Sequence, residues 1–203
     1  EDSNVTSLYG GDSFDLLPDV PPGYEYDFVN PSALLAMEPD SSMRYKVLWL
    51  DRNCETMSIE VLVKIQELAD AGIRICGSAP VRVAGLKALQ ADRVLFRRLV
   101  RDIWKSGRYN VFGTLSEALE GVEPDCLASF DGKEASPTDF RYVHRTLQDG
   151  NQVYWIRNFS GSDTWATISF RDHCRNAALF NPENGSIIPL EPSFEGGRAR
   201  VSI

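Results

Sequence analysis

The sequence predicts an open α/β domain with a mostly parallel sheet, followed by a small antiparallel β-sandwich. From residue 24 to about residue 132, short apolar strands alternate with amphipathic helices, which is the pattern of βαβ units. Residues 133–203 instead read as short strands separated by turn sequences. The chain has 203 residues, of which 43% are hydrophobic, so it is long enough to bury a core.

Residues 1–23 are predicted to be an irregular, acidic leader or linker, because glycines and prolines interrupt them. Residues 1–40 contain nine acidic residues and no Lys or Arg. The net charge of the whole chain is -8, so this segment accounts for all of it.

The α/β domain is expected over residues 24–132. Asn30 and Ser58 are predicted N-caps, Gly72 is a predicted helix end, and Thr114 with Glu117 has the spacing of a capping box. The expected strands are at residues 26–29, 45–50, 73–77, 109–112 and 126–129, and the expected helices at 31–37, 58–71, 92–105 and 114–121.

The β-sandwich is expected over residues 133–203. Asp149-Gly150 lies between two alternating runs, 140–147 and 152–158, and predicts a hairpin. Further strands are expected at residues 165–171, 177–180, 187–190 and 198–203, the last with Arg198, Arg200 and Ser202 facing outward. Because this strand reaches the final residue, we expect the sandwich to be truncated at 203.

Composition excludes several classes of protein. A pI near 4.8 argues against non-specific nucleic-acid binding, and no run of about 18 apolar residues predicts a membrane span. No signal peptide is visible, and the chain begins at Glu1 without Met, so we expect a mature or excised piece. The loops after the parallel strands lack G-x-G-x-x-G and P-loop sequences, so no cofactor is expected.

Cysteine chemistry has little support in the sequence. Cys54, Cys76, Cys126 and Cys174 are far apart with no C-x-x-C pair, which favours free thiols over a zinc site or a disulfide framework, and no metal site is expected. Cys76 lies at a strand end, as a nucleophile on a strand-to-helix elbow would, in the manner of class I glutamine amidotransferases. Such an elbow needs small neighbours, however, and position 74 is Arg.

Acid–base candidates are equally sparse. The only histidines are His144 and His173, and we expect His144 to be a hydrogen-bonded surface residue on an alternating strand. The dense acids Asp12, Asp15 and Asp19 lie in the irregular leader, where a perturbed pKa is least expected. We therefore predict no catalytic residue in this chain.

Aromatic residues in the β part have two readings. They are Tyr142, Tyr154, Trp155, Phe159 and Trp165. A small sandwich needs aromatic core residues, but Tyr154, Trp155 and Trp165 are also candidates for a sugar-stacking platform.

Several sequence segments, in the same order along the chain, resemble segments of α-L-rhamnosidases of glycoside hydrolase family 106. They are the runs at 21–30, 44–48 and 58–72, the strand phrases at 139–145 and 152–158, and the hairpin phrase LFNPENG at 179–185. In that family the last three read roughly R-x-I-H-R, Y-F-V-A-N and L-W-D-P-x-T-G. This chain departs from them with Phe180-Asn181 in the hairpin and with Trp155 where Phe is common, which leaves the sugar open.

The resemblance implies a place in a larger enzyme. Such proteins have a catalytic (β/α) barrel, then an amidotransferase-like, flavodoxin-like α/β domain, then β-sandwiches. This chain resembles the downstream part only, so the catalytic acids of the barrel have no counterpart here. The upstream barrel is the expected partner, with Tyr24, Asp27 and Asn30 as candidates for its interface or cleft, and a periplasmic or extracellular location is implied.

The sequence is compatible with three hypotheses about function. The first is a non-catalytic accessory region of a glycoside hydrolase. The second is a carbohydrate-binding module that uses the aromatics of the β part. The third is a small hydrolase or transferase that uses Cys76.

Overall fold

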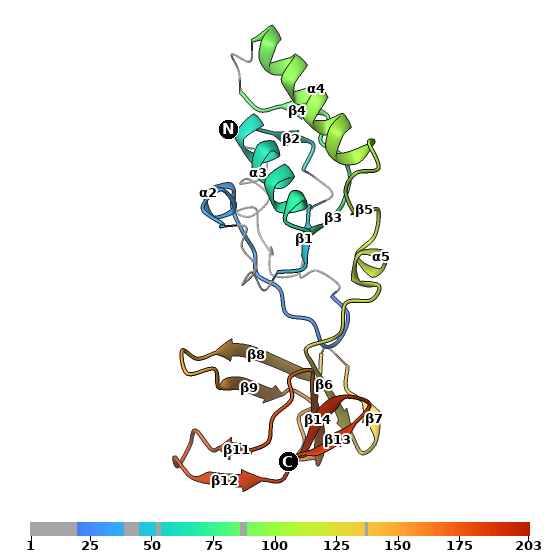
Figure 1. The fold of residues 1–203 in the computed structure, drawn as a ribbon. Helices are drawn as coiled ribbons and strands as arrows, with labels where there is room; N and C mark the ends of the chain where they lie inside the picture. Colours follow the sequence, from blue (N-terminus) through green and yellow to red (C-terminus); the bar gives the residue numbers. More distant parts are fainter. Residues whose placement is uncertain (1–19, 39–44, 52–53, 86–88, 137) are drawn as a thin grey trace. The chain divides into compact units, whose positions relative to one another are not determined.

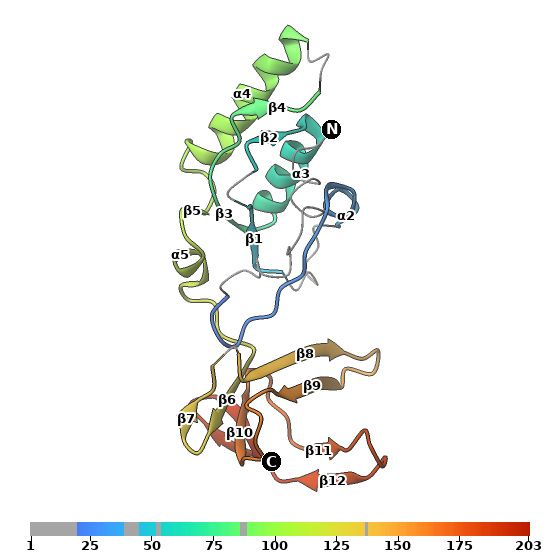
Figure 2. The ribbon, with the colours of Figure 1, turned by 180° about the vertical axis from the view of Figure 1, so that it is seen from behind.

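The computed structural model describes residues 20–38, 45–51, 54–85, 89–136 and 138–203 (Figures 1 and 2). They form two compact units. Unit 1 is Phe28–Val122, and unit 2 combines residues 20–27 with Glu123–Ile203. Unit 2 is therefore built from two separate stretches of chain, one on each side of unit 1 in the sequence.

Unit 1 is the α/β part that the sequence predicts. Its central sheet is parallel, with the strand order β1-β3-β5, and a second parallel pair joins β2 to β4. Its elements in chain order are α2 (Pro31–Leu35), β1 (Val47–Trp49), β2 (Thr56–Met57), α3 (Ile59–Asp70), β3 (Arg74–Cys76), β4 (Arg82–Val83), α4 (Gln90–Trp104), β5 (Val111–Phe112) and α5 (Leu115–Leu119).

Local signals set the helix boundaries of unit 1. The Ser58 hydroxyl accepts a hydrogen bond from the backbone N–H of Val61 at the start of α3, and the predicted capping box opens α5. Helix α4 starts two residues before the predicted Asp92, because this carboxylate accepts from the backbone N–H of Leu89 and so occupies the third helical position. Helix α3 buries an apolar stripe of Val61, Leu62, Ile65, Leu68 and Ala69.

Unit 2 is β-rich and antiparallel. Its largest sheet has the order β13-β14-β10-β6-β7, and β8–β9 and β11–β12 form separate hairpins. The strands are β6 (Cys126–Phe130), β7 (Lys133–Glu134), β8 (Phe140–Thr146), β9 (Gln152–Asn158), β10 (Ala166–Phe170), β11 (Ala177–Phe180), β12 (Ile187–Leu190), β13 (Ser193–Glu195) and β14 (Arg198–Ser202).

Two predicted strands differ from the structure. The strand expected at residues 126–129 exists as β6, but it pairs antiparallel with β10 rather than extending the parallel sheet. Cys126 and Ala128 are buried in the core of unit 2, together with Ile168 and Val201, and this burial decides the partner. No strand forms at residues 26–29.

Arg198 is the third difference, because it does not face solvent as its alternation predicts. Its side chain is only 12% exposed. The guanidinium donates to Ser169 Oγ and to the carbonyl oxygens of Pro124, Asp125 and Ser169, and so links β14 and β10 to the segment before β6.

Residues 20–27 join unit 2 through Gly23. Its carbonyl oxygen accepts from the backbone N–H of Asp125 at 2.7 Å and from the Tyr142 hydroxyl at 2.9 Å. Gly23 has a φ of +88°, and a Cβ there would lie 2.7 Å from side-chain carbons of Leu127 and Pro124. Only glycine fits this close approach without strain.

Among the described residues, none of the helices combines the length and the apolar character that crossing a membrane requires.

Candidate functional site

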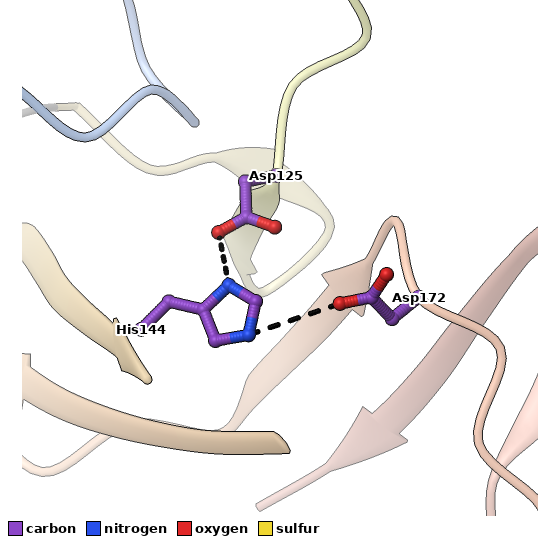
Figure 3. A group of neighbouring side chains, drawn as sticks. All are labelled: Asp125, His144 and Asp172. Atoms are coloured by element: carbon purple, nitrogen blue, oxygen red, sulfur yellow. Dashed lines mark hydrogen bonds and ion pairs between the residues drawn. The ribbon is translucent and has the colours of Figure 1, made fainter. Parts of the chain in front are cut away.

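A cluster of ionisable side chains lies inside unit 2, at Asp125, His144 and Asp172 (Figure 3). Asp125 precedes β6 and Asp172 follows β10, whereas His144 is on β8. His144 alternates with Tyr142 and Phe140 on the inward face of that strand. His144 is 6% exposed and Asp125 is 9% exposed, so both are withdrawn from solvent.

Both ring nitrogens of His144 face oxygen atoms. Nδ1 lies 2.8 Å from Asp125 Oδ2, and Nε2 lies 2.7 Å from Gln152 Oε1 and 3.8 Å from Asp172 Oδ2. The orientation of the Gln152 amide is set by its neighbours, because Thr146 Oγ1 donates to Oε1 while Nε2 donates to the Gly150 carbonyl. The Gln152 amide therefore presents its oxygen to the His144 ring.

Tyr154 covers this ring and bonds to the same carboxylates. The ring centroids of Tyr154 and His144 are 4.0 Å apart and nearly parallel. The Tyr154 hydroxyl, which has one proton to donate, lies 3.2 Å from Asp172 Oδ2 and 3.4 Å from Asp125 Oδ1. Burial, and then the negative charges of Asp125 and Asp172, raise the pKa of this phenol, so it stays a donor.

Arg171 adds a positive charge to the cluster. Its guanidinium lies 3.2 Å from Asp125 Oδ1. The Asp125 carboxylate is thus in contact with both Arg171 and His144. Such pairing matters because an unpaired buried charge is costly.

This geometry is typical of a structural network of hydrogen bonds and ion pairs rather than of a catalytic triad. In a triad, one ring nitrogen faces a carboxylate and the other faces a nucleophilic hydroxyl or thiol. Here the second nitrogen of His144 faces the Gln152 amide and Asp172. The cluster instead joins β8, β9 and the segments flanking β6 and β10.

The same three residues are the one group within the described parts of the chain that could offer a metal ion three ligand atoms, all within 4.8 Å of one another. A metal would need a lone pair on a ring nitrogen of His144. Both nitrogens already lie at hydrogen-bond distance from oxygen atoms of Asp125 and Gln152, so they are engaged in hydrogen bonds rather than open to a metal ion.

His144 is thus hydrogen-bonded as expected, but the prediction that it lies at the surface is wrong. The inward phase of β8 buries it. The sequence carries the signal for that phase, since Phe140, Tyr142 and His144 share one face. Nothing in the sequence pairs His144 with Asp125 and Asp172, which come from distant segments.

The predicted interface residues are distributed over both units. Tyr24 and Asp27 belong to unit 2, and Asn30 belongs to unit 1. The Asn30 side chain accepts from the backbone N–H of Ala33 and caps α2, so it has a structural role. Burial is the main cause of a raised pKa at the Tyr24 phenol.

The predicted stacking residues lie on different faces of unit 2. Tyr154 faces inward onto His144, whereas Trp155, the next residue of β9, is 61% exposed on the opposite face. Trp165 precedes β10 and is 77% exposed.

Cys76 is packed within unit 1. It is 1% exposed, and burial, followed by the charge of Glu117, raises the pKa of its thiol, which opposes thiolate formation. Gly77 has a φ of +124° and a Cβ there would lie 2.9 Å from the Leu50 carbonyl oxygen, so this glycine serves close strand packing. The other acid candidates, Asp12, Asp15 and Asp19, lie outside the described residues.

Comparison with known proteins extends over nearly the whole chain. The alpha-L-rhamnosidase model of glycoside hydrolase family 106 matches residues 1–194. A curated protein of Formosa agariphila, described as "Putative beta-glucuronidase", is 23% identical over 180 residues, which are 85% of this chain and 15% of that protein. This chain therefore spans less than a fifth of that relative.

A solved structure agrees at the level of the fold. The rhamnosidase from Novosphingobium sp. PP1Y superposes with a TM-score of 0.77 and 23% identity, over 91% of this chain and 19% of that one. Because the family model spans residues 1–194 of 203, this chain belongs to glycoside hydrolase family 106, the alpha-L-rhamnosidase family, and is a glycosidase-related protein.

Proposed function

We propose that this chain is a non-catalytic accessory region of a larger glycoside hydrolase of the α-L-rhamnosidase type, which acts on polysaccharide or oligosaccharide. One observation carries the proposal. The family match covers almost the whole chain, but the chain spans only 15% of the Formosa relative and 19% of the Novosphingobium rhamnosidase. Most of such a protein, including room for a catalytic domain, lies outside these 203 residues.

The chemistry of the described residues supports the same proposal. Glycoside hydrolysis uses two carboxyl groups about 5–9 Å apart across a cleft. The clustered carboxylates Asp125 and Asp172 are instead engaged with His144, Tyr154 and, for Asp125, Arg171. Acids held in this way are poor candidates for a proton donor and a nucleophile.

The partner in this proposal is the protein's own upstream catalytic barrel. Tyr24, Asp27 and Asn30 are the proposed contacts with that barrel or its cleft. Unit 1 would serve as an amidotransferase-like, flavodoxin-like scaffold without the chemistry of its namesakes, because Cys76 is buried. A periplasmic or extracellular location is proposed from the family alone.

An assay of the 203-residue chain on an aryl α-L-rhamnoside tests this proposal. We expect no turnover above buffer, with the Novosphingobium rhamnosidase as the positive control and a cooperative urea transition as proof that the chain is folded. Turnover that persists through purification and disappears in Cys76→Ala or His144→Gln would overturn the proposal.

A second candidate function is carbohydrate binding by unit 2. The exposure of Trp155 and Trp165 favours it, because exposed indole rings can stack on sugar rings. Tyr154 does not contribute to an exposed platform, since its ring packs on His144.

A further inference from the structure

The outward face of the β8–β9 hairpin concentrates arginine and tryptophan. We call it the hairpin face. Its side chains come from three directly opposed pairs, Arg141 with Arg157, Val143 with Trp155, and Arg145 with Val153. They point away from the face that carries Tyr142, His144 and Tyr154, because successive residues of a strand alternate. All six residues of the hairpin face are exposed.

This face is positively charged within an acidic region. Residues 123–203 contain eleven acidic and eight basic residues, yet three of the eight bases lie on the hairpin face, and no acid does. Within the described residues, none of these three arginines forms an ion pair. Arg145 lies near the Glu25 carboxylate and is partly offset by its charge.

Arg141 and Arg157 therefore form an uncompensated pair. They are direct cross-strand neighbours, a placement in which like charges repel. Both guanidinium groups lie over the Phe159 ring, with Cζ 5.6 Å and 4.0 Å from its centroid. The two guanidinium groups thus share one aromatic ring, which supplies no countercharge. An anion that bridged them would remove the repulsion.

Trp155 adds a second kind of recognition beside this pair. Its side chain, 61% exposed, is two residues from Arg157 on the same strand and face. An indole ring can stack on the C–H face of a pyranose, and an arginine fork can bind a carboxylate through two parallel hydrogen bonds. A uronic acid offers both groups on one ring.

We propose that the hairpin face binds a uronate-containing oligosaccharide, with a sugar ring stacked on Trp155 and its carboxylate held by Arg141 and Arg157. The inference rests on the proposed accessory function in a glycoside hydrolase and names the class of glycan that this region holds. Charge complementarity selects a carboxylated sugar over a neutral one. The acidic surroundings disfavour a nucleic acid, whose phosphate backbone needs a broader basic footprint.

Titration of the full 203-residue chain with trigalacturonate tests the proposal, followed by tryptophan fluorescence and calorimetry. We expect saturable binding that weakens with added salt, since the charges are exposed. The methyl-esterified trisaccharide, which keeps the rings but loses the charge, should bind at least about tenfold more weakly.

Variants locate the site. Trp155→Ala and the double variant Arg141→Gln/Arg157→Gln should each weaken binding about tenfold or more. The matched controls Phe180→Ala and Arg175→Gln change an exposed aromatic and an exposed arginine elsewhere in unit 2 and should bind as the parent chain does.

Four results would overturn the inference. They are equal affinity for the ester and the acid, loss of binding in the controls, binding of a sulfated oligosaccharide or a single-stranded oligonucleotide without binding of the uronate, and no binding at all. None of these outcomes bears on the rhamnoside assay. Turnover in that assay that persists through purification and disappears in Cys76→Ala or His144→Gln would refute the accessory role whether or not trigalacturonate binds.

Discussion

At the scale of single residues, His144 is a buried side chain whose ring is hydrogen-bonded at both nitrogens. Its two nitrogens are committed to Asp125 and Gln152, and its ring is covered by Tyr154. Removal of the imidazole would leave the Asp125 carboxylate with Arg171 as its remaining charged partner among the described residues.

Replacement of His144 by Leu is therefore expected to lower the free energy of unfolding by about 2–4 kcal/mol, because the buried Asp125 carboxylate and the Gln152 amide lose their hydrogen-bond partner. Urea denaturation at pH 7 measures this loss. His173→Leu is the control, since His173 is exposed, and its effect should stay within about 0.5 kcal/mol. A loss for His144→Leu as small as that of the control would contradict the structural role of His144.

Gly23 provides a second test at this scale, because its position demands both a left-handed φ and the absence of a Cβ. Gly23→Ala is expected to destabilise unit 2 by about 2–4 kcal/mol through backbone strain and the close approach to Leu127 and Pro124. Gly150→Ala is the matched control. It has a similar φ of +85° but open space around it, and should cost only about 1 kcal/mol.

Urea unfolding monitored by far-UV circular dichroism compares the two glycine variants. Equal losses of stability in the two variants would show that the positive φ alone is responsible. They would contradict a close approach of Leu127 and Pro124 to Gly23.

At the scale of elements, Arg74 has a structural role at the start of β3, the strand that ends with the buried thiol of Cys76. Its guanidinium Nη1 donates to the carbonyl oxygens of Ala118 at 2.8 Å and Glu120 at 2.6 Å. These carbonyls lie at the C-terminal end of α5, where helix oxygens lack intrahelical donors. The arginine that argued against an elbow at Cys76 thus ties a helix to the parallel sheet.

Arg74→Met keeps most of the aliphatic stem and removes these donors, so it should lower the stability of unit 1 by about 1–2 kcal/mol. The control is Arg82→Met, which breaks the exposed Arg82–Glu55 pair and should cost no more than about 0.5 kcal/mol. Chemical denaturation followed by Trp104 fluorescence reports on both. A smaller loss for Arg74→Met than for Arg82→Met would contradict this role.

The core of unit 2 gives an element-scale prediction about pH. Burial is the largest cause, and the Asp125 charge the next, of raised pKa values at the Cys126 thiol and the Tyr142 phenol, whose ordinary values are 9.0 and 10.0. Above about pH 9 the unfolded chain releases these protons while the folded chain keeps them, so the stability of unit 2 should fall as pH rises.

Urea titrations at pH 7, 9 and 10.5 measure this slope. Cys126→Ala removes one of the titrating groups and should flatten the loss between pH 7 and 10.5. An identical slope in that variant would show that Cys126 does not contribute.

The predictable part of the fold is the part with local signals. Ser58 and Thr114 cap helices where their spacing predicts, and Asp149-Gly150 closes the β8–β9 hairpin. The partner of β6 has no such signal. Its alternation of Cys126 and Ala128 suits either a parallel or an antiparallel neighbour, and burial against β10 decides between them.

The candidate site was predictable only in fragments, for the same reason. Alternation along β8 places His144 with buried aromatics, but the sequence separates it from Asp125 and Asp172 by 19 and 28 residues. Arg198 likewise alternates as an outward residue and yet turns back onto β10. Side chains that meet only through tertiary packing leave no periodic trace.

At the scale of the whole molecule, unit 2 depends on residues 20–27, which precede unit 1 in the sequence. Gly23 bonds to Asp125 and Tyr142, and the Glu25 carboxylate accepts from the backbone N–H of His144. Gly23 and Asp125 are joined by a hydrogen bond, and residues 27 and 123 are only four and two positions from them along the chain.

Deletion of residues 28–122 with a flexible linker of about six residues in their place should therefore leave unit 2 folded. Circular dichroism and the dispersion of amide NMR signals measure this. A second version that lacks residues 20–27 as well should lose several kcal/mol of stability or fail to fold. Equal stability of the two versions would refute the role given to Gly23 and Glu25.

Because unit 2 is built from two segments of the chain, it also affects how the protein responds to proteolysis. A protease that cuts once inside unit 1 severs the covalent path between residues 20–27 and Glu123–Ile203, but it leaves the hydrogen bonds of Gly23 and Glu25 intact. The two pieces would then remain noncovalently associated until a denaturant separates them. A gel run under denaturing conditions could report damage that size-exclusion chromatography of the native protein would miss.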